Sequence, residues 1–200
     1  RQEAGLEDKQ ATLLSVAGLA DLWEPDLLDW LVSVRKESPE IALHASTLTS
    51  VALSQQVLNG MIDLAFLFEP QSLPEISSRF MKRMNLVMVS TENDILTTGA
   101  LQSNYIMIDW GTAYAVTHAK LYPDAPSSAL FMTHGSLAMN FILRNGGSAY
   151  LPETWCTPLI KKKKLFPVAD ASEIEREIHA ICRDDNPKNS VIHQALEHFK

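Results

Sequence analysis

The sequence predicts an α/β fold of two lobes joined by a hinge. Apolar runs of strand length alternate along the chain with amphipathic runs of helix length, which is typical of parallel sheets with right-handed helical crossovers. An amphipathic run stops at Asn59-Gly60, and the apolar run 63–68 follows almost at once. Asparagine or glycine can take the left-handed conformation that ends a helix, so a tight turn from a helix into a buried strand is predicted here. Residues 69–74 then contain two prolines, which suits a hinge or crossover between lobes.

Length and composition limit both the architecture and the partners of the chain. With 200 residues, of which 46% are hydrophobic, the chain can form one large domain or two small lobes. The net charge of −7 argues against binding of nucleic acid by this chain itself. The run Lys161–Lys164 is interpreted as a solvated turn because no aromatic residue interrupts it. Cys156 and Cys182 are interpreted as reduced thiols of a cytosolic protein. No apolar run reaches the length that spans a membrane.

The first lobe is expected to follow residues 1–10, which are polar and charged and are interpreted as the end of a linker. Asp21 can cap a first helix, and Glu24 three residues later can reach back to the cap. That helix should end near residues 38–39, where a proline follows a serine. A second helix is expected to open in the hydroxyl-rich stretch 47–50. The predicted strands of this lobe are 12–17, 41–46 and 63–68.

The second lobe repeats the alternation of strand and helix patterns. Strands are expected over 86–90, 105–109, 129–133, 148–152 and 177–183, and helices over 112–121, 137–144 and 188–199. The terminal helix is assigned to the first lobe. The expected domain limits are therefore 11–69 plus 184–200 for lobe I and 70–183 for lobe II.

Sequence motifs for catalysis or cofactor binding are missing from the chain. It contains no glycine-rich dinucleotide or phosphate loop and no Gly-x-Ser-x-Gly elbow. The six histidines are scattered, and no Cys or His pair has the spacing of a structural zinc site, so neither a metal nor a cofactor is expected. His134 precedes a helix start and is interpreted as a loop residue bonded to backbone, a ligand contact or, last, a catalytic base. Trp23 and Trp110 follow predicted strands and can either line a pocket or pack against the sheet.

Helix starts that follow predicted strands form a candidate ligand site. Asp21, Thr47–Ser50, Thr112 and Ser136 each stand at such a start. In parallel sheets these starts gather at one edge, where free amides and hydroxyls can bind small polar or anionic ligands. A capping role alone would also explain each hydroxyl. Two lobes that face each other over a hinge form a cleft, which is a common place for a ligand.

In the order of these elements the chain resembles the effector-binding region of LysR-type transcriptional regulators. The segments that carry the resemblance are Leu13–Gly18, Trp23–Leu28 ahead of Ser38-Pro39, Val57–Ala65, Ala138–Gly147 and Ala149–Pro152. The most specific piece is Gly60 followed by Asp63-Leu64-Ala65. Residues 22–24 and 109–111, with Trp155, are more similar to the HdfR-like branch than to the family at large. The resemblance implies a periplasmic-binding-protein-like fold of type 2, with two Rossmann-like lobes.

The resemblance also implies partners for the chain. In this family a winged helix-turn-helix binds DNA and a linker helix dimerises, and both would precede residue 1. Effector-binding domains of the family pair side by side and antiparallel, which would use the helix over 22–38 and a lobe II helix such as 137–144. A homodimer, a tetramer of the intact regulator, a cytoplasmic location and no enzymatic activity are therefore expected.

The family's effector contacts can be carried over to matching positions. They are Gly18, Leu19, Ala20, Thr49, Ser50, Phe68, Trp110, Thr112, His134 and Ser136. The first loop usually is longer and offers a serine or threonine to an effector carboxylate, whereas this chain has Leu19-Ala20. No arginine or lysine falls in the predicted cleft loops either. A neutral or partly aromatic effector is therefore favoured over an anionic one, and a cleft without a physiological ligand stays an alternative.

Two other functions are compatible with the same fold class. The chain starts at Arg1 rather than at methionine and is expected to be a piece of a longer or processed protein. A mature periplasmic solute-binding protein is the first alternative, and a signal peptide upstream in place of a helix-turn-helix would identify it. The second is a small α/β enzyme with His134 and Asp109 as acid–base groups.

Overall fold

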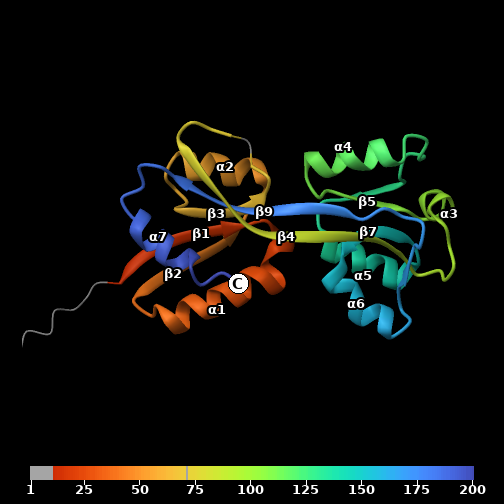
Figure 1. Cartoon of the computed structure of the whole chain (residues 1–200), viewed down its shortest axis with the longest axis horizontal. Coiled ribbons are helices and arrows are strands. Elements are labelled where there is room, and N and C mark those ends of the chain that lie inside the picture. Colours follow the sequence, from red (N-terminus) through yellow and green to blue (C-terminus); the bar gives the residue numbers. More distant parts are fainter. Residues whose placement is uncertain (1–10, 71) are drawn as a thin grey trace, which may run out of the picture. The chain divides into compact units, whose positions relative to one another are not determined.

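The computed structural model describes residues 11–70 and 72–200, which form two compact units (Figure 1). Unit 1 runs to Met81 and resumes over His179–Lys200, and unit 2 is Lys82–Ile178. Both boundaries fall inside strands, β4 (Ile76–Ser90) and β9 (Ile174–Arg183), so residues 70–81 and 179–183, which were expected in lobe II, count with unit 1. The linker end expected over 1–10 lies outside the described residues.

Unit 1 contains a largely parallel sheet. Strands β1 (Thr12–Gly18), β2 (Ile41–Thr47) and β3 (Leu64–Phe68) lie in the order β2-β1-β3-β9, and β1 is parallel to both of its neighbours. The strands predicted for this lobe are confirmed to within one residue at each end. β3 is buried along its whole length, which agrees with its uninterrupted apolar sequence.

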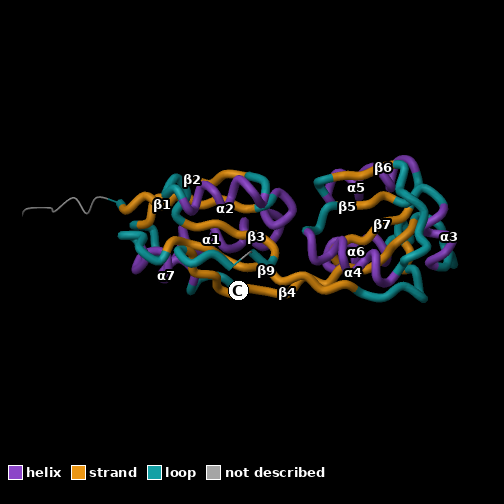
Figure 2. The backbone as a smooth tube through the Cα atoms, turned by 90° about the horizontal axis from the view of Figure 1, so that it is seen from above, coloured by secondary structure: helices purple, strands orange, loops and turns teal. Residues whose placement is uncertain are grey.

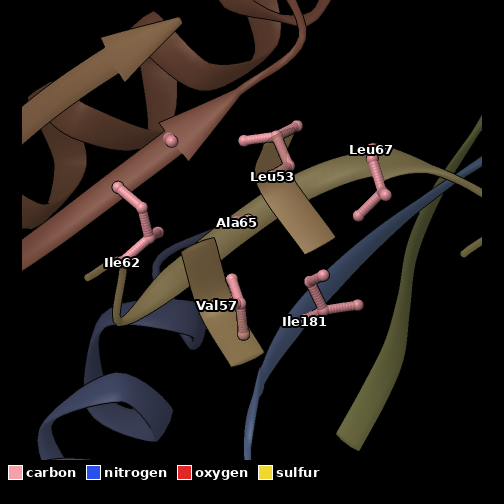
Figure 3. Packing of buried hydrophobic residues seen from close by; sticks show 7 residues of the cluster. Leu53, Val57, Ile62, Ala65, Leu67 and Ile181 are labelled. Atoms are coloured by element: carbon pink, nitrogen blue, oxygen red, sulfur yellow. The ribbon is translucent and has the colours of Figure 1, made fainter. Parts of the chain in front are cut away.

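One face of this sheet is covered by α2 (Ser50–Leu58), on the side opposite α1 and α7 (Figure 1). Leu53 and Val57 of α2 are fully buried against Ala17 of β1, Ala65 of β3 and Ile181 of β9 (Figure 3). The four-residue spacing of Leu53 and Val57 places both on one helix face, so a single apolar stripe holds the helix on the sheet.

The other face is covered by α1 (Leu28–Glu37) and α7 (Asn189–Leu196). Trp30 of α1 donates its indole N–H to the carbonyl oxygen of Ala195 at 2.8 Å, and its ring meets Phe66 edge-on at 4.9 Å. Phe199 stacks on the same Phe66 ring at 6.0 Å. These aromatic contacts attach the terminal helix to unit 1, where the sequence had placed it.

The first helix begins later than its capping pattern predicts. After β1 the chain forms a 3₁₀ turn, η1 (Ala20–Leu22), and a π-helical turn, η2 (Trp23–Leu27), before α1 starts at Leu28. Asp21 lies inside η1, and Glu24 has the extended dihedral angles φ −115° and ψ 122°. The capping-box prediction is therefore wrong, because an extended Glu24 is outside the helical turn that such a box requires. The predicted helix end near residue 38 is confirmed.

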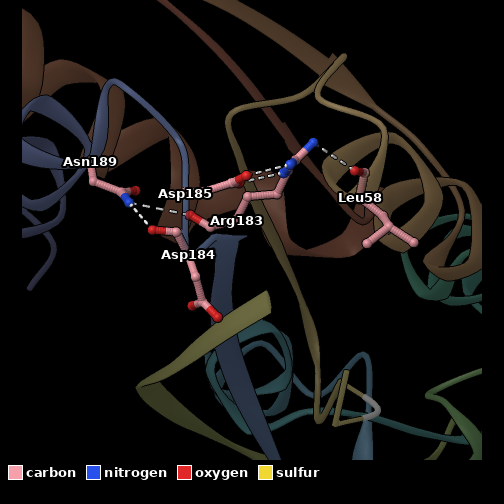
Figure 4. A network of polar contacts seen from close by, with 5 residues as sticks. All are labelled: Leu58, Arg183, Asp184, Asp185 and Asn189. Carbon is pink, nitrogen blue, oxygen red and sulfur yellow. Dashed lines mark hydrogen bonds and ion pairs between the residues drawn. The ribbon is translucent and has the colours of Figure 1, made fainter. Parts of the chain in front are cut away.

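The junction between α2 and β3 has the turn that its sequence predicts. Gly60 has φ +79°, and the carboxamide of Asn59 accepts a hydrogen bond from the amide of Met61 at 3.1 Å. Arg183 at the end of β9 donates to the carbonyl oxygen of Leu58 at 3.1 Å, which satisfies one of the free carbonyls of the helix end (Figure 4). Asp185 holds that guanidinium through contacts of 2.7 and 2.8 Å.

A buried carboxylate follows this junction and connects three distant segments. Asp63 is 7% exposed and accepts hydrogen bonds from the amide of Ser15 at 2.9 Å, from Asn186 at 3.0 Å and from the Lys188 ammonium at 2.9 Å. Burial raises the pKa of Asp63, but the three hydrogen bonds and the charge of Lys188 together outweigh it, so the pKa is lowered below 3.8. The ionised carboxylate thus joins β1, β3 and the segment before α7.

Unit 2 contains a second parallel pair, β5 (Ile106–Ile108) and β6 (Leu130–Met132), which lie side by side (Figure 2). β7 (Ser148–Pro152) pairs antiparallel with β4, as does the short β8 (Phe166–Pro167). Helix α4 (Thr112–Leu121) covers one face, and α5 (Gly135–Asn145) and α6 (Glu153–Lys161) cover the other (Figure 1). Tyr105, just before β5, bridges to Ser148 of β7.

Three elements of unit 2 lie outside the sequence-based predictions. They are α3 (Thr97–Gln102), α6 and β8. Lys161–Lys164 forms the exposed end of α6 and the turn after it, which confirms a solvated turn. Within the described residues no helix is both long and apolar enough to cross a membrane.

We expect Asp63→Asn to lower the free energy of unfolding by about 1–3 kcal/mol at pH 7, because an ionised, hydrogen-bonded carboxylate is lost from a buried position. The folded-state pKa is lowered, so this contribution is present above pH 4 and is lost as the pH falls through the folded pKa. Urea unfolding followed by circular dichroism at pH 7 and pH 3 measures it. Glu37→Gln, on the exposed end of α1, is the control. An equal deficit at both pH values would contradict the role of the charge.

Candidate functional site

The carboxyl ends of the three parallel strands of unit 1 meet at one edge of the sheet. Gly18 lies beside Thr47 of β2 and Phe66 of β3. The amide of Leu19 donates to the Phe66 carbonyl oxygen at 3.2 Å, and the amide of Leu48 donates to the Gly18 carbonyl oxygen at 3.3 Å. The structure therefore brings the first loop, the start of α2 and the end of β3 together, as the sequence predicted.

The first loop offers backbone to a ligand rather than side-chain hydroxyls. Gly18 is buried, and a Cβ atom there would lie 2.5 Å from Leu27 Cδ1 and 3.6 Å from Trp23 Nε1. A side chain at residue 18 would therefore force the buried Leu27 to shift, so glycine permits the close packing of η2 against the end of β1. Leu19 packs its half-buried side chain against the core beneath α2, and Ala20 begins η1.

The start of α2 has one hydroxyl that already caps the helix. Thr49 is the N-cap residue, and its Oγ1 accepts a hydrogen bond from the amide of Ala52 at 3.4 Å. Ser50, the first helical residue, is exposed. Phe68 ends β3 with 9% of its surface exposed. The capping interpretation thus accounts for Thr49, while the edge keeps Ser50 and the first amides of the helix.

A second edge of the same kind lies in unit 2. The amide of Asp109, after β5, donates to the carbonyl oxygen of Met132 in β6 at 2.9 Å, so the two strands end together. Thr112 starts α4 after β5, and His134 and Ser136 stand at the start of α5 after β6. All three side chains are exposed. The structure brings these predicted site residues to one edge of unit 2.

Trp110 belongs to the core of unit 2. Its side chain is fully buried, its indole N–H donates to the carbonyl oxygen of Tyr150 at 2.9 Å, and its ring meets Trp155 of α6 at 6.0 Å. Its polar atom is thus used inside the protein, and of the two roles open to it from the sequence, the structure supports packing.

Two further residues near these edges lie outside the carried-over contacts: Trp23, which the sequence offers as a pocket residue, and Arg176, which it does not. Trp23 Nε1 is buried and has no hydrogen-bond partner in the described part of the chain, although it lies close to Gly18. Arg176 of β9 is 3% exposed and donates its Nε to the carbonyl oxygen of Trp110 at 2.8 Å. The alternation of Ile174, Arg176 and Ile178 is the one sequence signal that could have indicated an inward arginine.

The two groups considered as an acid–base pair of an enzyme each contact another residue. The carboxylate of Asp109 accepts from the amide of Gly111 at 3.0 Å, and Nδ1 of His134 is 3.0 Å from Thr133 Oγ1. Among the described residues, no group of three or more His, Cys, Asp and Glu side chains is placed to hold a metal ion.

Both cysteines are buried and weakly acidic. Burial raises the pKa of Cys156 to about 12, and the nearby Glu153 carboxylate acts in the same direction. Burial also raises the pKa of Cys182, with Asp184 adding to it. Because the thiolate is the reactive form, both side chains are poor nucleophiles at neutral pH.

We expect both thiols of the folded chain to react with 5,5′-dithiobis(2-nitrobenzoate) at pH 7.5 at least about a hundredfold more slowly than in urea, because thiolate fraction and access are both low. Absorbance at 412 nm follows the reaction. Thr117→Cys, at an exposed position of α4, provides a fast-reacting control. If one thiol per wild-type chain reacted as fast as the introduced cysteine of this control, the thiols would not be protected by burial.

Comparison with known proteins gives one family match that covers nearly the whole chain. The family model described as LysR substrate binding domain matches residues 8–200. A curated relative, the HTH-type transcriptional regulator HdfR of Yersinia enterocolitica, is 25% identical over 197 residues, which cover 94% of this chain and 66% of the relative. The chain therefore spans slightly less than two thirds of that relative's length.

Solved structures show the same fold at low sequence identity. The sulfate-bound regulatory domain of the OxyR2 E204G mutant from Vibrio vulnificus has a TM-score of 0.77 and 17% identity, with 97% of each chain covered. Full-length CbnR complexed with its target DNA has a TM-score of 0.73 and 14% identity, with 95% of this chain and 70% of CbnR covered. At these identities the likeness is one of fold.

Proposed function

Because this chain belongs to the LysR substrate-binding domain family, we propose that it senses a small-molecule effector for a LysR-type transcriptional regulator. The observation that carries the proposal is the family match over residues 8–200, together with two parallel-strand edges that end in loops and helix starts. An effector acts by binding one conformational state of the protein more tightly than another. The chain itself performs no catalysis in this proposal.

We assign effector contacts to the two edges. At the unit 1 edge, an effector oxygen would accept from the unpartnered indole N–H of Trp23 and from the first amides of α2 near Ser50. At the unit 2 edge, the exposed Thr112, His134 and Ser136 provide polar contacts. The proposed set is Gly18, Leu19, Ala20, Thr49, Ser50, Phe68, Trp110, Thr112, His134 and Ser136, with Trp110 acting by supporting its loop. The first loop lacks hydroxyls, which favours an uncharged or partly aromatic effector.

A ligand found by thermal-shift screening of the 200-residue chain should bind about fivefold to tenfold more weakly to Ser50→Ala, Ser136→Ala or Trp23→Phe, the effect of one lost hydrogen bond. Titration calorimetry measures the affinities. Ser54→Ala, one turn further along α2, should leave the affinity unchanged. Binding that survives all three changes would overturn the assignment of the edges, whereas it would leave the family membership intact.

Exposed apolar stripes on two helices support a homodimer. Leu28 and Val32 on α1 are 45% and 66% exposed, and Leu137 and Phe141 on α5 are 55% and 39% exposed. Each pair is spaced by four residues and therefore lies on one helix face. We propose that the α1 stripe of one copy packs against the α5 stripe of a second copy, and that the intact regulator forms a tetramer from such dimers.

Val32→Asp and Leu137→Asp should each turn the dimer into a monomer, because a carboxylate would be buried in an apolar contact without a partner. Sedimentation velocity measures the state. Val51→Asp is the matched control, since Val51 on α2 is 69% exposed and lies outside both stripes. A wild-type chain that is monomeric at 50 µM, or a Val51→Asp variant that dissociates equally, would argue against this interface.

DNA binding belongs to the part of the protein outside this sequence. CbnR was solved as a full-length protein with its target DNA, and the curated relatives are longer than this chain. We propose a winged helix-turn-helix upstream of residue 1 and action on DNA in the cytoplasm. The net charge of −7 supports the view that this part does not itself bind DNA. Because both thiols are buried and weakly acidic, the proposal gives neither Cys156 nor Cys182 a part in sensing.

A further inference from the structure

Unit 2 contains a cavity of about 410 Å³ at the C-terminal half of α4, away from the end of the helix that starts at Thr112. Its walls include His118 and Tyr122 from this part of the chain, the loop with Pro126 and Ser128, and Phe131 of β6. The loop precedes β6, so the cavity lies at the amino end of that strand, whereas the effector edge lies at its carboxyl end. The volume is in the range of small-molecule sites.

His118, which lines this cavity, has one ring nitrogen without a hydrogen bond to the described residues. Its side chain is 7% exposed, and its Nε2 lies 2.8 Å from the hydroxyl of Tyr105. Its Nδ1 makes no hydrogen bond with the described residues, and it is not among their fully enclosed unsatisfied atoms. Because His118 lines the cavity, we infer that Nδ1 can bond to a molecule bound there.

An aromatic network fixes the orientation of this ring. The rings of Tyr105, Tyr114, Tyr122 and Tyr150 lie 5.2–6.0 Å from the imidazole. Tyr122 and Tyr150 are joined through their hydroxyls at 2.6 Å, and Tyr150 donates to the carbonyl oxygen of Ser172 at 2.6 Å. Burial lowers the pKa of His118 and raises that of Tyr105, so a neutral imidazole faces a protonated phenol. When Tyr105 donates to Nε2, the imidazole hydrogen lies on Nδ1.

The walls of the cavity match an uncharged, flat molecule. No lining residue is Asp, Glu, Lys or Arg, so a charged ligand would lose water without gaining a counter-ion. Phe131, Tyr122 and Pro126 provide apolar faces against which a ring can pack. We propose that this cavity is a second ligand site, for an uncharged aromatic molecule whose oxygen or nitrogen accepts a hydrogen bond from His118 Nδ1. The site is independent of the effector edges and of what binds there.

Benzamide and benzoate provide a matched pair of probes that differ in charge. In ¹H–¹⁵N NMR titrations of the 200-residue chain, benzamide should shift amides within 118–131, and benzoate should bind at least about tenfold more weakly because the cavity has no counter-charge. Shifts that are absent at 10 mM benzamide, or confined to other residues, would overturn the site. Equal binding of benzoate would overturn the ligand class.

Variants separate this cavity from the effector edge. Ala119→Trp, from an exposed lining position, should fill the cavity and abolish the benzamide shifts, whereas Thr117→Trp on another face of the same helix should preserve them. His118→Gln should weaken binding about fivefold if it folds, as expected for one altered hydrogen bond. Ser136→Ala, which alters the effector edge, should leave the benzamide-induced shifts within 118–131 unchanged. Full binding by Ala119→Trp, or equal loss in Thr117→Trp, would contradict the proposal.

Discussion

The buried carboxylate of Asp63 is the contact on which the arrangement of unit 1 depends. It joins β1 through the Ser15 amide at 2.9 Å and the segment before α7 through Asn186 and Lys188. A charge at 7% exposure needs such partners, so these contacts favour the arrangement in which the three segments lie together. The left-handed Gly60 places the carboxylate there, because it turns the chain directly from α2 into β3.

The candidate ligand site at the edge of the unit 1 sheet follows directly from this arrangement. Once β3 lies parallel to β1, the ends of both strands and the start of α2 meet around Gly18. A side chain at Gly18 would then displace Leu27, which packs against this strand end. Unit 2 reaches the same geometry differently, with β5 and β6 parallel and Trp110 anchored below their ends by Tyr150 and Arg176. Each edge combines strand ends with helix starts, and in unit 2 the exposed Thr112, His134 and Ser136 add polar groups, which suits a small ligand.

Local patterns were sufficient for the buried strands and for the starts of α2 and α4, but not for the η1 and η2 turns after β1 or for elements with mixed surroundings. The first half of β4 is largely exposed and polar, so residues 76–85 show no apolar run. Helix α6 contains Pro158 and ends in a lysine, which obscures its apolar face. The placement of Trp110 in the core and of Arg176 beside it depends on contacts between residues 66 positions apart, which no local pattern contains. Residue positions at the edges were therefore predictable, whereas the side chains that point into the core beneath them were not.

The same backbone fold can present different side chains to a ligand, because different residues line its edges and its cavity. The likeness to OxyR2 at a TM-score of 0.77 concerns backbone, while Cys156 is buried with a pKa of about 12. In the same unit, His118 lies under a cavity whose walls carry no charged residue. Neutral hydrogen-bonding groups in apolar walls discriminate by shape and by single hydrogen bonds rather than by charge. Both the short Leu19-Ala20 loop and this cavity thus favour uncharged ligands, through residues of different units and different elements.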